Sequence, residues 1–294
     1  MTDLCEEFRE YLIKVKKSSS NTVESYIRDV SQYFSYCASS QKDPLTADID
    51  TLHAYLDYLS IMGKSEATKT RIIASLRCYY RFLISKGTVS ENPADSIKLK
   101  KAEKKLPGIL DSNEIVLLLS QPDGNDYKSI RDKAMLELLY ATGIKVSELI
   151  DLAVSDINLQ IGILHLHNEK KERIVPMYPA AVKTVANYLV NVRPAIVTDK
   201  TEDRLFTNMN GQPMSRQGFW KIIKHYAEKA GIKKDITPHT LRHSFAAHLL
   251  ENGAQLKDIK EMLGHSDISS TQVYAQFIKS KYTASYSRFH PLAK

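Results

Sequence analysis

The sequence predicts a mainly α-helical protein with one small antiparallel β-hairpin, divided into two domains. Apolar residues recur at helical spacing through most of the chain, and strand-like runs appear only between residues 162 and 177. Residues 98–108 form a lysine-rich run that closes with a Pro-Gly turn, which is typical of a linker. A chain of 294 residues is long for one domain. We therefore expect a helical domain at 1–97, a basic linker at 98–108 and a second domain at 109–294.

Composition excludes several classes of protein. Hydrophobic residues make up 43% and charged residues 26%, which is a globular composition. The net charge of +7 permits a nucleic-acid partner without proving one. The apolar runs are far shorter than the roughly 20 residues of a membrane helix, and no signal peptide is visible. We expect no membrane partner, a cytoplasmic location and, for the three widely spaced cysteines, reduced thiols.

The first domain is predicted to be helical because capping residues precede its apolar stripes. Ser20–Glu24 reads as one helix start, and further helices are expected at Asp50–Leu59 and Ser65–Ser85. In the last of these, the apolar residues share one face: Ile72, Ile73, Leu76, Tyr79, Tyr80 and Leu83.

Positive charge is concentrated on that same helix. Residues 64–86 hold six lysines and arginines against one acidic residue, in a domain that is otherwise acidic. Most charged helical faces are simply solvated, but this concentration favours a face that contacts DNA. The predicted DNA contacts are Lys69, Arg71, Arg77 and, in the second domain, Arg216.

The second domain is predicted to contain helices on both sides of the hairpin. Before it we expect helices from Ser112, over Arg131–Tyr140 and from Val146; after it, at 179–192, 215–230, 238–252, 256–263 and 269–277. The hairpin pairs Gly162–His167 with Arg173–Met177 around a polar tip.

The stretch Thr237–Ser244 combines a helix start with two cationic side chains. Thr237 is a good N-cap and Pro238 suits the first helical position. His239 and Arg242 then lie on the same face of the first turn, where free N–H groups and the helix dipole favour an anion such as a phosphate oxygen. His-x-x-Arg alone is a weak signal, and the two residues could equally be ordinary members of a capping turn.

A second stretch ends in a tyrosine. Gly264 fits the position after a helix end, His265 follows in the loop, and Tyr274 lies on the next predicted helix. The spacing proves nothing alone, because the chain has 16 tyrosines.

Together these stretches resemble the tyrosine recombinase (integrase) family, and specifically its Xer-like members. The family order appears as Ala141-Thr-Gly-Ile-Lys-Val-Ser-Glu-Leu149, His239-x-x-Arg242, Leu263-Gly-His265 and Tyr274. Further landmarks are similar to Xer-type sequences: Ser20-Asn-Thr-Val-x-Ser-Tyr26, Asn92-Pro-Ala94, Gly211-Gln-Pro-Met-Ser-Arg216 and His290-Pro291. The resemblance extends over nearly the whole chain. It implies a SAM-like helical domain, an integrase catalytic domain and a C-terminal tail, about 278–294, that reaches a neighbouring subunit.

The resemblance also implies site-specific DNA recombination. Tyr274 would attack the scissile phosphate and form a 3′-phosphotyrosyl link, and strand exchange would pass through a Holliday junction. Arg242, His239 and His265 would donate hydrogen bonds to the phosphate oxygens, with Glu148 orienting their neighbours. No cofactor and no metal are expected, since the exchange is isoenergetic. The expected partners are double-stranded DNA with a specific site and a homo- or hetero-tetramer on two duplexes, with a second recombinase or an activator as an open possibility, in a nucleoid-associated protein.

Two departures from the family pattern bear on activity. Lys145 replaces the first family arginine, and a lysine cannot give the planar two-point contact of a guanidinium. The hairpin tip, 168–173, is one residue shorter than the family tip. No lysine stands at the general-acid position, whether residues are counted forward from Lys145 or back from Arg173. Lys170 is the nearest candidate, and Lys171 is the other. The hypothesis that follows is reduced or conditional cleavage with DNA binding retained.

Two other functions compete with the recombinase. The departures favour a DNA-binding accessory protein with the recombinase fold and weak catalysis, whereas the intact Tyr274, His239, Arg242 and His265 count against it. A type IB topoisomerase would share the chemistry, and a tail helix at 278–288 that reaches a neighbouring subunit would distinguish the recombinase. The target DNA sequence and the choice between a chromosomal and a mobile-element role stay open.

Overall fold

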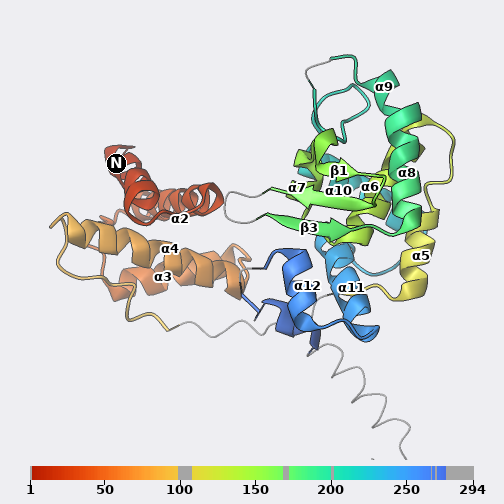
Figure 1. The fold of residues 1–294 in the computed structure, drawn as a ribbon. Helices are drawn as coiled ribbons and strands as arrows, with labels where there is room; N and C mark the ends of the chain where they lie inside the picture. The colour runs from red at the N-terminus through yellow and green to blue at the C-terminus, as the bar shows by residue number, and fades with distance from the viewer. Residues whose placement is uncertain are drawn as a thin grey trace, which may run out of the picture. The chain divides into compact units, whose positions relative to one another are not determined.

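The chain forms two compact units in the computed structural model, Met1–Lys104 and Lys105–Lys294 (Figure 1). The structure describes residues 2–98, 108–167, 172–199, 202–265, 267–268 and 270–275. The division between the units falls within the segment predicted as a linker, most of which lies outside the described residues. The predicted fold class is confirmed, since the regular elements are mainly helices with one small antiparallel sheet.

The N-terminal unit is built from helices that begin at side-chain caps. Its elements are α1 (Thr2–Glu10), a π-helical turn η1 (Tyr11–Val15), α2 (Ser20–Ser39), α3 (Ile49–Ile61) and α4 (Glu66–Ser85). Ser19, Asp48 and Ser65 each accept a hydrogen bond from the backbone N–H three residues later, which satisfies one free donor of α2, α3 and α4. The helices predicted from their cap residues therefore begin within two residues of the expected places.

The core of this unit lies between α2, α3 and α4. All six apolar residues predicted to share one face of α4 are buried. One charged pair lies within this packing: Asp29 of α2 is 1% exposed, pairs with Arg71 of α4 and accepts a hydrogen bond from Ser75 Oγ at 2.7 Å. A buried carboxylate without these partners would be strongly unfavourable, so Arg71 helps to hold α2 against α4.

The C-terminal unit places helices around a three-stranded sheet. Its elements are α5 (Ser112–Ser120), α6 (Tyr127–Thr142), α7 (Val146–Asp151), a 3₁₀ turn η2 (Val154–Asp156), β1 (Ile157–Asn158), β2 (Ile163–Leu166), β3 (Arg173–Pro176), α8 (Pro179–Asn191), α9 (Arg193–Ile196), α10 (Arg216–Lys229), α11 (Pro238–Glu251) and α12 (Leu256–Leu263). Residues 270–275 are also helical, within the helix predicted at 269–277.

The sheet has the strand order β1-β2-β3, with both pairs antiparallel. The predicted hairpin is confirmed as β2 and β3, in the register that pairs Leu164 with Val175. Residues 168–171 of its predicted tip, 168–173, lie outside the described residues. The sequence analysis missed β1, because a strand of two residues shows no alternation.

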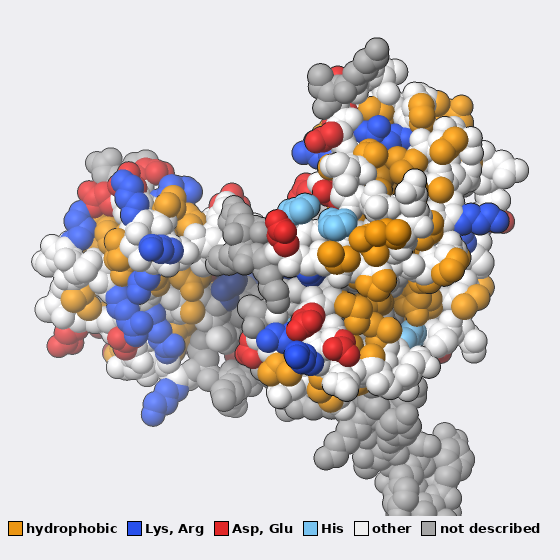
Figure 2. Space-filling view, in the orientation of Figure 1, with side chains coloured by type: hydrophobic (Ala, Val, Ile, Leu, Met, Phe, Trp, Pro, Cys, Tyr) orange, Lys and Arg blue, Asp and Glu red, His pale blue; other side chains and the backbone are white. Residues whose placement is uncertain are grey.

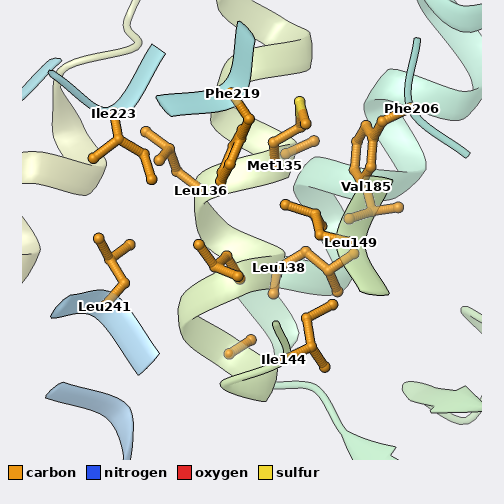
Figure 3. Packing of buried hydrophobic residues seen from close by; sticks show 14 of the residues in the cluster. Met135, Leu136, Leu138, Ile144, Leu149, Val185, Phe206, Phe219, Ile223 and Leu241 are labelled. Carbon is orange, nitrogen blue, oxygen red and sulfur yellow. The ribbon is translucent and has the colours of Figure 1, made fainter. Parts of the chain in front are cut away.

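Helix α6 is the centre of the C-terminal core. Figure 3 shows Met135, Leu136 and Leu138 of this helix among buried side chains of α7, α8, α10 and α11. The helix is longer than the predicted Arg131–Tyr140, since Asp126 caps its start and Gly143 ends it in a left-handed conformation. This fixed end positions the loop between α6 and α7, which carries Lys145.

Two sequence-based expectations concern features of the whole chain. The three cysteines are free thiols, and Cys37 is buried. None of the helices in the described part of the chain is long and apolar enough to cross a membrane.

Candidate active site

The first turn of α11 brings Arg242 into the interior of the C-terminal unit. Thr237 caps the helix and Pro238 occupies its first turn, as predicted. Arg242 is 4% exposed and donates from Nη1 to the carbonyl of Gly143 at 2.5 Å and from Nη2 to the carbonyl of Leu263 at 2.6 Å. One guanidinium thereby joins the end of α6, the start of α11 and the end of α12. Burial lowers the pKa of this guanidinium, and the nearby Glu148 carboxylate acts in the opposite direction.

The two glycines of the family motifs lie at or directly after the two carbonyls that Arg242 binds. Gly143 has φ +59°, and a Cβ atom there would lie 2.2 Å from Cδ1 of Phe245. Gly264 has φ +65°, and a Cβ atom there would lie 2.8 Å from Nη1 of Arg173. Both positions require a residue without a side chain, because the backbone is left-handed and the neighbouring group is packed against it.

Glu148 and Arg173 form a largely buried ion pair near Arg242. Arg173 Nη1 and Nη2 donate to the two carboxylate oxygens of Glu148 at 3.0 and 2.7 Å, and Nε donates to the carbonyl of Met262 at 2.8 Å. Glu148 also accepts the backbone N–H of Lys145 at 2.8 Å. The Glu148 carboxylate thus contacts Arg173 and the backbone of Lys145, and its orienting role stays a prediction. The Lys145 side chain itself is exposed at the start of α7.

His265 lies within the electrostatic field of these cations. Its pKa is lowered from 6.5 to about 4 by burial and then by Arg242, Lys145, His243 and Arg173. A lowered pKa keeps the imidazole neutral at pH 7, so that one ring nitrogen donates and the other accepts. Nδ1 lies 3.0 Å from Oγ1 of Thr271, which fixes the ring at the turn before the last helical segment.

Tyr274 is buried in this cluster, with 1% of its surface exposed. Burial raises the pKa of its hydroxyl, and Arg242 opposes that shift. The hydroxyl lies 2.9 Å from Nδ1 of His243, and the two ring centroids are 5.6 Å apart. Tyr274 therefore lies beside His243, the residue that directly follows Arg242, and its joint catalytic role with Arg242 and His265 stays a prediction.

His243 is a member of the cluster that sequence reasoning missed. Its pKa is lowered from 6.5 to about 4 by burial, by His239 and by Arg242. The available signal was its place directly after Arg242, one helical turn beyond His239, but nothing local reveals a contact with a residue 31 positions later.

His239 and Arg216 lie at the edge of the site. His239 is exposed, and its ring centroid is 6.3 Å from that of His243. Both His239 and Arg216 line a pocket of about 340 Å³ whose other walls are Val146, Gln217, Trp220 and Pro238. Lys170, the predicted general acid, lies outside the described residues.

The other predicted DNA contacts belong to the N-terminal unit, where each has partners within the chain. Lys69 donates to Ser60 Oγ at 3.0 Å and pairs with Glu66, and Arg71 pairs with the buried Asp29. Arg77 donates to the carbonyls of Ala94 and Ile97 at 2.9 and 2.5 Å. Lys and Arg side chains nevertheless gather on the face of this unit that Figure 2 shows, and α4 alone carries four of them.

No group of three or more His, Cys, Asp and Glu side chains in the described part of the chain could hold a metal ion. The side chains gathered in the cluster are a guanidinium, neutral imidazoles and a tyrosine hydroxyl.

Comparisons with known proteins identify the family of this chain. Residues 109–280 match the model of the phage integrase family, and residues 5–87 match the phage integrase N-terminal SAM-like domain. The tyrosine recombinase XerD of Halalkalibacterium halodurans is 44% identical over 278 residues, covering 94% of this chain and 93% of that protein. The tyrosine recombinase XerD of Staphylococcus epidermidis is 42% identical over 295 residues, covering both chains completely.

Solved structures show the same fold. The XerA recombinase is 27% identical, with a TM-score of 0.55 over 99% of each chain. The XerH site-specific recombinase bound to its palindromic difH substrate is 20% identical, with a TM-score of 0.75 over 96% of this chain and 84% of that one. The chain belongs to the phage integrase family, the tyrosine recombinases, with Xer-type proteins among its relatives.

Proposed function

We propose that this chain is a site-specific DNA recombinase that cuts and rejoins strands through Tyr274. The observation that carries this function is the burial of Tyr274 beside His243, the residue that directly follows Arg242. The charge of Arg242 opposes the rise in the Tyr274 pKa and contributes to the lowering of the His265 pKa, which supports a common site. A nucleophile and preorganised donors in one water-poor place are what phosphoryl transfer requires.

The reaction exchanges one phosphodiester for another. Tyr274 Oη attacks the scissile phosphorus, the bond to the 5′-oxygen breaks, and the tyrosine becomes linked to the 3′-phosphate. The hydroxyl proton of Tyr274 passes to a base or to water, and the 5′-oxygen leaves as a hydroxyl after gaining a proton. The 5′-hydroxyl of a partner strand then reverses the step, and two such exchanges pass through a Holliday junction. No nucleotide triphosphate is required, because the number of phosphodiester bonds does not change.

The donors act on the charge that gathers on the non-bridging oxygens. Arg242 supplies a guanidinium with five N–H groups, of which two bind the carbonyls of Gly143 and Leu263. His265 and His239 each supply one ring N–H, and Glu148 holds Arg173 and the Lys145 backbone in place. We assign the general acid of the leaving 5′-oxygen to Lys170, with Lys171 as the alternative from the same hairpin tip.

Lys145 attenuates cleavage in this proposal. It replaces the family arginine at the start of α7, and its positive charge helps to lower the pKa of His265. A point charge gives fewer fixed hydrogen bonds to a phosphate than a guanidinium, so the transition state is stabilised less. A chain with cleavage weakened further would act as a DNA-binding accessory protein.

The covalent intermediate tests this function directly. The full chain is incubated with a duplex that carries its recombination site and a nick that lets the released fragment diffuse away. We expect a protein–DNA adduct that survives denaturation and is absent for Tyr274→Phe. DNA binding without adduct at any enzyme concentration would favour the accessory protein instead.

The proposed partners follow from the same chemistry. We assign contacts with the DNA backbone to Lys69, Arg71, Arg77 and Arg216, and the four Lys and Arg residues of α4 support the first three. Contacts of this kind position a protein on phosphates and make affinity fall steeply with salt. Strand exchange between two duplexes requires four copies, as a homo-tetramer or with a second recombinase or an activator, in a cytoplasmic, nucleoid-associated complex.

A further inference from the structure

The nucleophile is buried against a histidine that has no place in the mechanism above. Tyr274 is 1% exposed, and its hydroxyl lies 2.9 Å from Nδ1 of His243. A scissile phosphate is a large, hydrated anion, and it cannot reach an oxygen atom that is enclosed in this way. The contact with His243 therefore belongs to a state that precedes attack.

The direction of this hydrogen bond follows from the two side chains. Burial raises the pKa of the Tyr274 hydroxyl, which therefore keeps its proton at pH 7. Burial together with His239 and Arg242 lowers the pKa of His243 to about 4, so its imidazole is neutral. The phenol O–H consequently donates to Nδ1, and the ring hydrogen of His243 is on Nε2.

We propose that His243 is a positioning residue that holds the Tyr274 hydroxyl in a buried resting place and that this hydrogen bond breaks before the tyrosine attacks DNA. The inference rests on the proposed function, since it concerns the nucleophile of that reaction. His243 does not receive the tyrosine's proton in this arrangement, because a weakly basic imidazole cannot remove a proton from a phenol that holds it tightly.

The hydrogen bond between Tyr274 and His243 slows covalent attachment to DNA by stabilising the state before attack. An interaction that exists before attack and is lost in the transition state slows the chemical step. One hydrogen bond between neutral groups is worth about 1 kcal/mol, which corresponds to about a fivefold change in rate. Removing the acceptor should therefore speed covalent attachment by about fivefold.

The test uses variants that differ in the acceptor. His243→Phe keeps a planar ring and removes the acceptor, whereas His243→Asn places an amide oxygen close to the position of Nδ1. The same helix carries a matched control, because Tyr140 forms a hydrogen bond of 2.9 Å with Nδ1 of His248. His248→Phe removes a second Tyr–His bond that does not involve the nucleophile.

The first readout is the rate of adduct formation on the nicked duplex at saturating DNA. We expect His243→Phe to exceed the wild type by about fivefold, His243→Asn to return toward the wild-type rate and His248→Phe to leave the rate unchanged. A rate for His243→Phe equal to the wild type would overturn the proposal. So would a loss of tenfold or more, which would make His243 a proton acceptor. If His243→Phe does not fold in thermal melting, His243→Gln replaces it, since its longer side chain moves the acceptor away from Tyr274.

The second readout needs no DNA and separates this proposal from the proposed function. The full chain is labelled with 3-fluorotyrosine, and the Tyr274 fluorine signal is identified by its loss in Tyr274→Phe. We expect this signal to shift in His243→Phe and to return toward its wild-type position in His243→Asn. An unchanged signal in both variants would overturn the contact. The expected shift without any adduct in the wild type would instead reject the recombinase function and leave the contact standing.

Discussion

Arg173 and Glu148 form a two-point ion pair, with Nη1 and Nη2 of the arginine 3.0 and 2.7 Å from the two carboxylate oxygens. The pair joins β3 to α7, and Nε of the same arginine binds the carbonyl of Met262 at the end of α12. The strand that follows the hairpin tip, the helix that follows Lys145 and the helix that precedes His265 are thus fixed by one side chain. The geometry of the site therefore depends on this arginine.

Arg173→Ala should destabilise the C-terminal unit. The two side chains are 7% and 10% exposed, so the substitution removes a two-point cationic partner from a largely buried carboxylate. Breaking such a pair typically costs about 3 kcal/mol or more of unfolding free energy. The measurement is urea unfolding followed by circular dichroism. Arg204→Ala is the control, because Arg204 pairs with Glu202 at 3.5 Å and is 38% exposed, and we expect it to cost less than about 1 kcal/mol. Equal losses of unfolding free energy in the two variants would contradict a stabilising role for the Arg173–Glu148 pair.

Gly143→Ala should be more damaging than Gly231→Ala. Both glycines have a positive φ, +59° and +65°, so both substitutions carry similar backbone strain of about 1 kcal/mol. At Gly143 the new Cβ would also lie 2.2 Å from the ring of Phe245, whereas nothing lies within 4 Å of the new Cβ at Gly231. The clash adds about 1–3 kcal/mol and shifts the carbonyl that Arg242 binds. Thermal melting compares the two, and the same melting temperature for both would reject the packing argument.

Lys145→Arg should raise the rate of adduct formation. A guanidinium at this position can bind a phosphate at two points, and we expect about a tenfold gain from one added charge-assisted hydrogen bond. The matched control is Lys233→Arg, a substitution of the same kind at an exposed position. An adduct rate for Lys145→Arg equal to that of the wild type would show that lysine does not attenuate cleavage.

Stability should fall as the pH drops, partly because of His265. The pKa of His265 is about 4 in the folded chain instead of 6.5. At a pH between these two values the imidazole binds a proton in the unfolded chain but not in the folded chain. The free energy of unfolding therefore falls as the pH passes down through this window, and this histidine has no effect above it. His265→Asn should show a smaller loss than the wild type between about pH 7.5 and about pH 5 in urea unfolding. Identical losses would mean that His265 is not buried as described.

The sequence predicted the elements whose signals are local. Caps such as Ser65 and Thr237 lie next to the helices that they begin, and the Pro-Gly run ends the predicted linker. The two-residue strand β1 escaped prediction because it forms only through its pairing with β2. The site residues were recognised because they lie in family sequence motifs. The structure adds which groups their side chains contact.

What could not be predicted depends on partners that are distant in the chain. Arg71 reads as a surface cation by its place on α4, and its partner Asp29 lies 42 residues earlier. Arg77 binds two carbonyls that lie 17 and 20 residues later. Their assignment to DNA stays a prediction, which alanine variants and binding measured at two salt concentrations would test. His243 escaped notice for the same reason, because only the folded chain brings it to Tyr274.

The central claim is that Tyr274 becomes covalently linked to DNA. The most direct measurement is mass spectrometry of the adduct formed on a nicked duplex carrying the recombination site, after digestion of the protein and the DNA. The account predicts a peptide that contains Tyr274 with a 3′-phosphonucleotide on the hydroxyl, and no such peptide from Tyr274→Phe. A link through any other residue, or DNA cleavage by Tyr274→Phe at the wild-type rate, would contradict it.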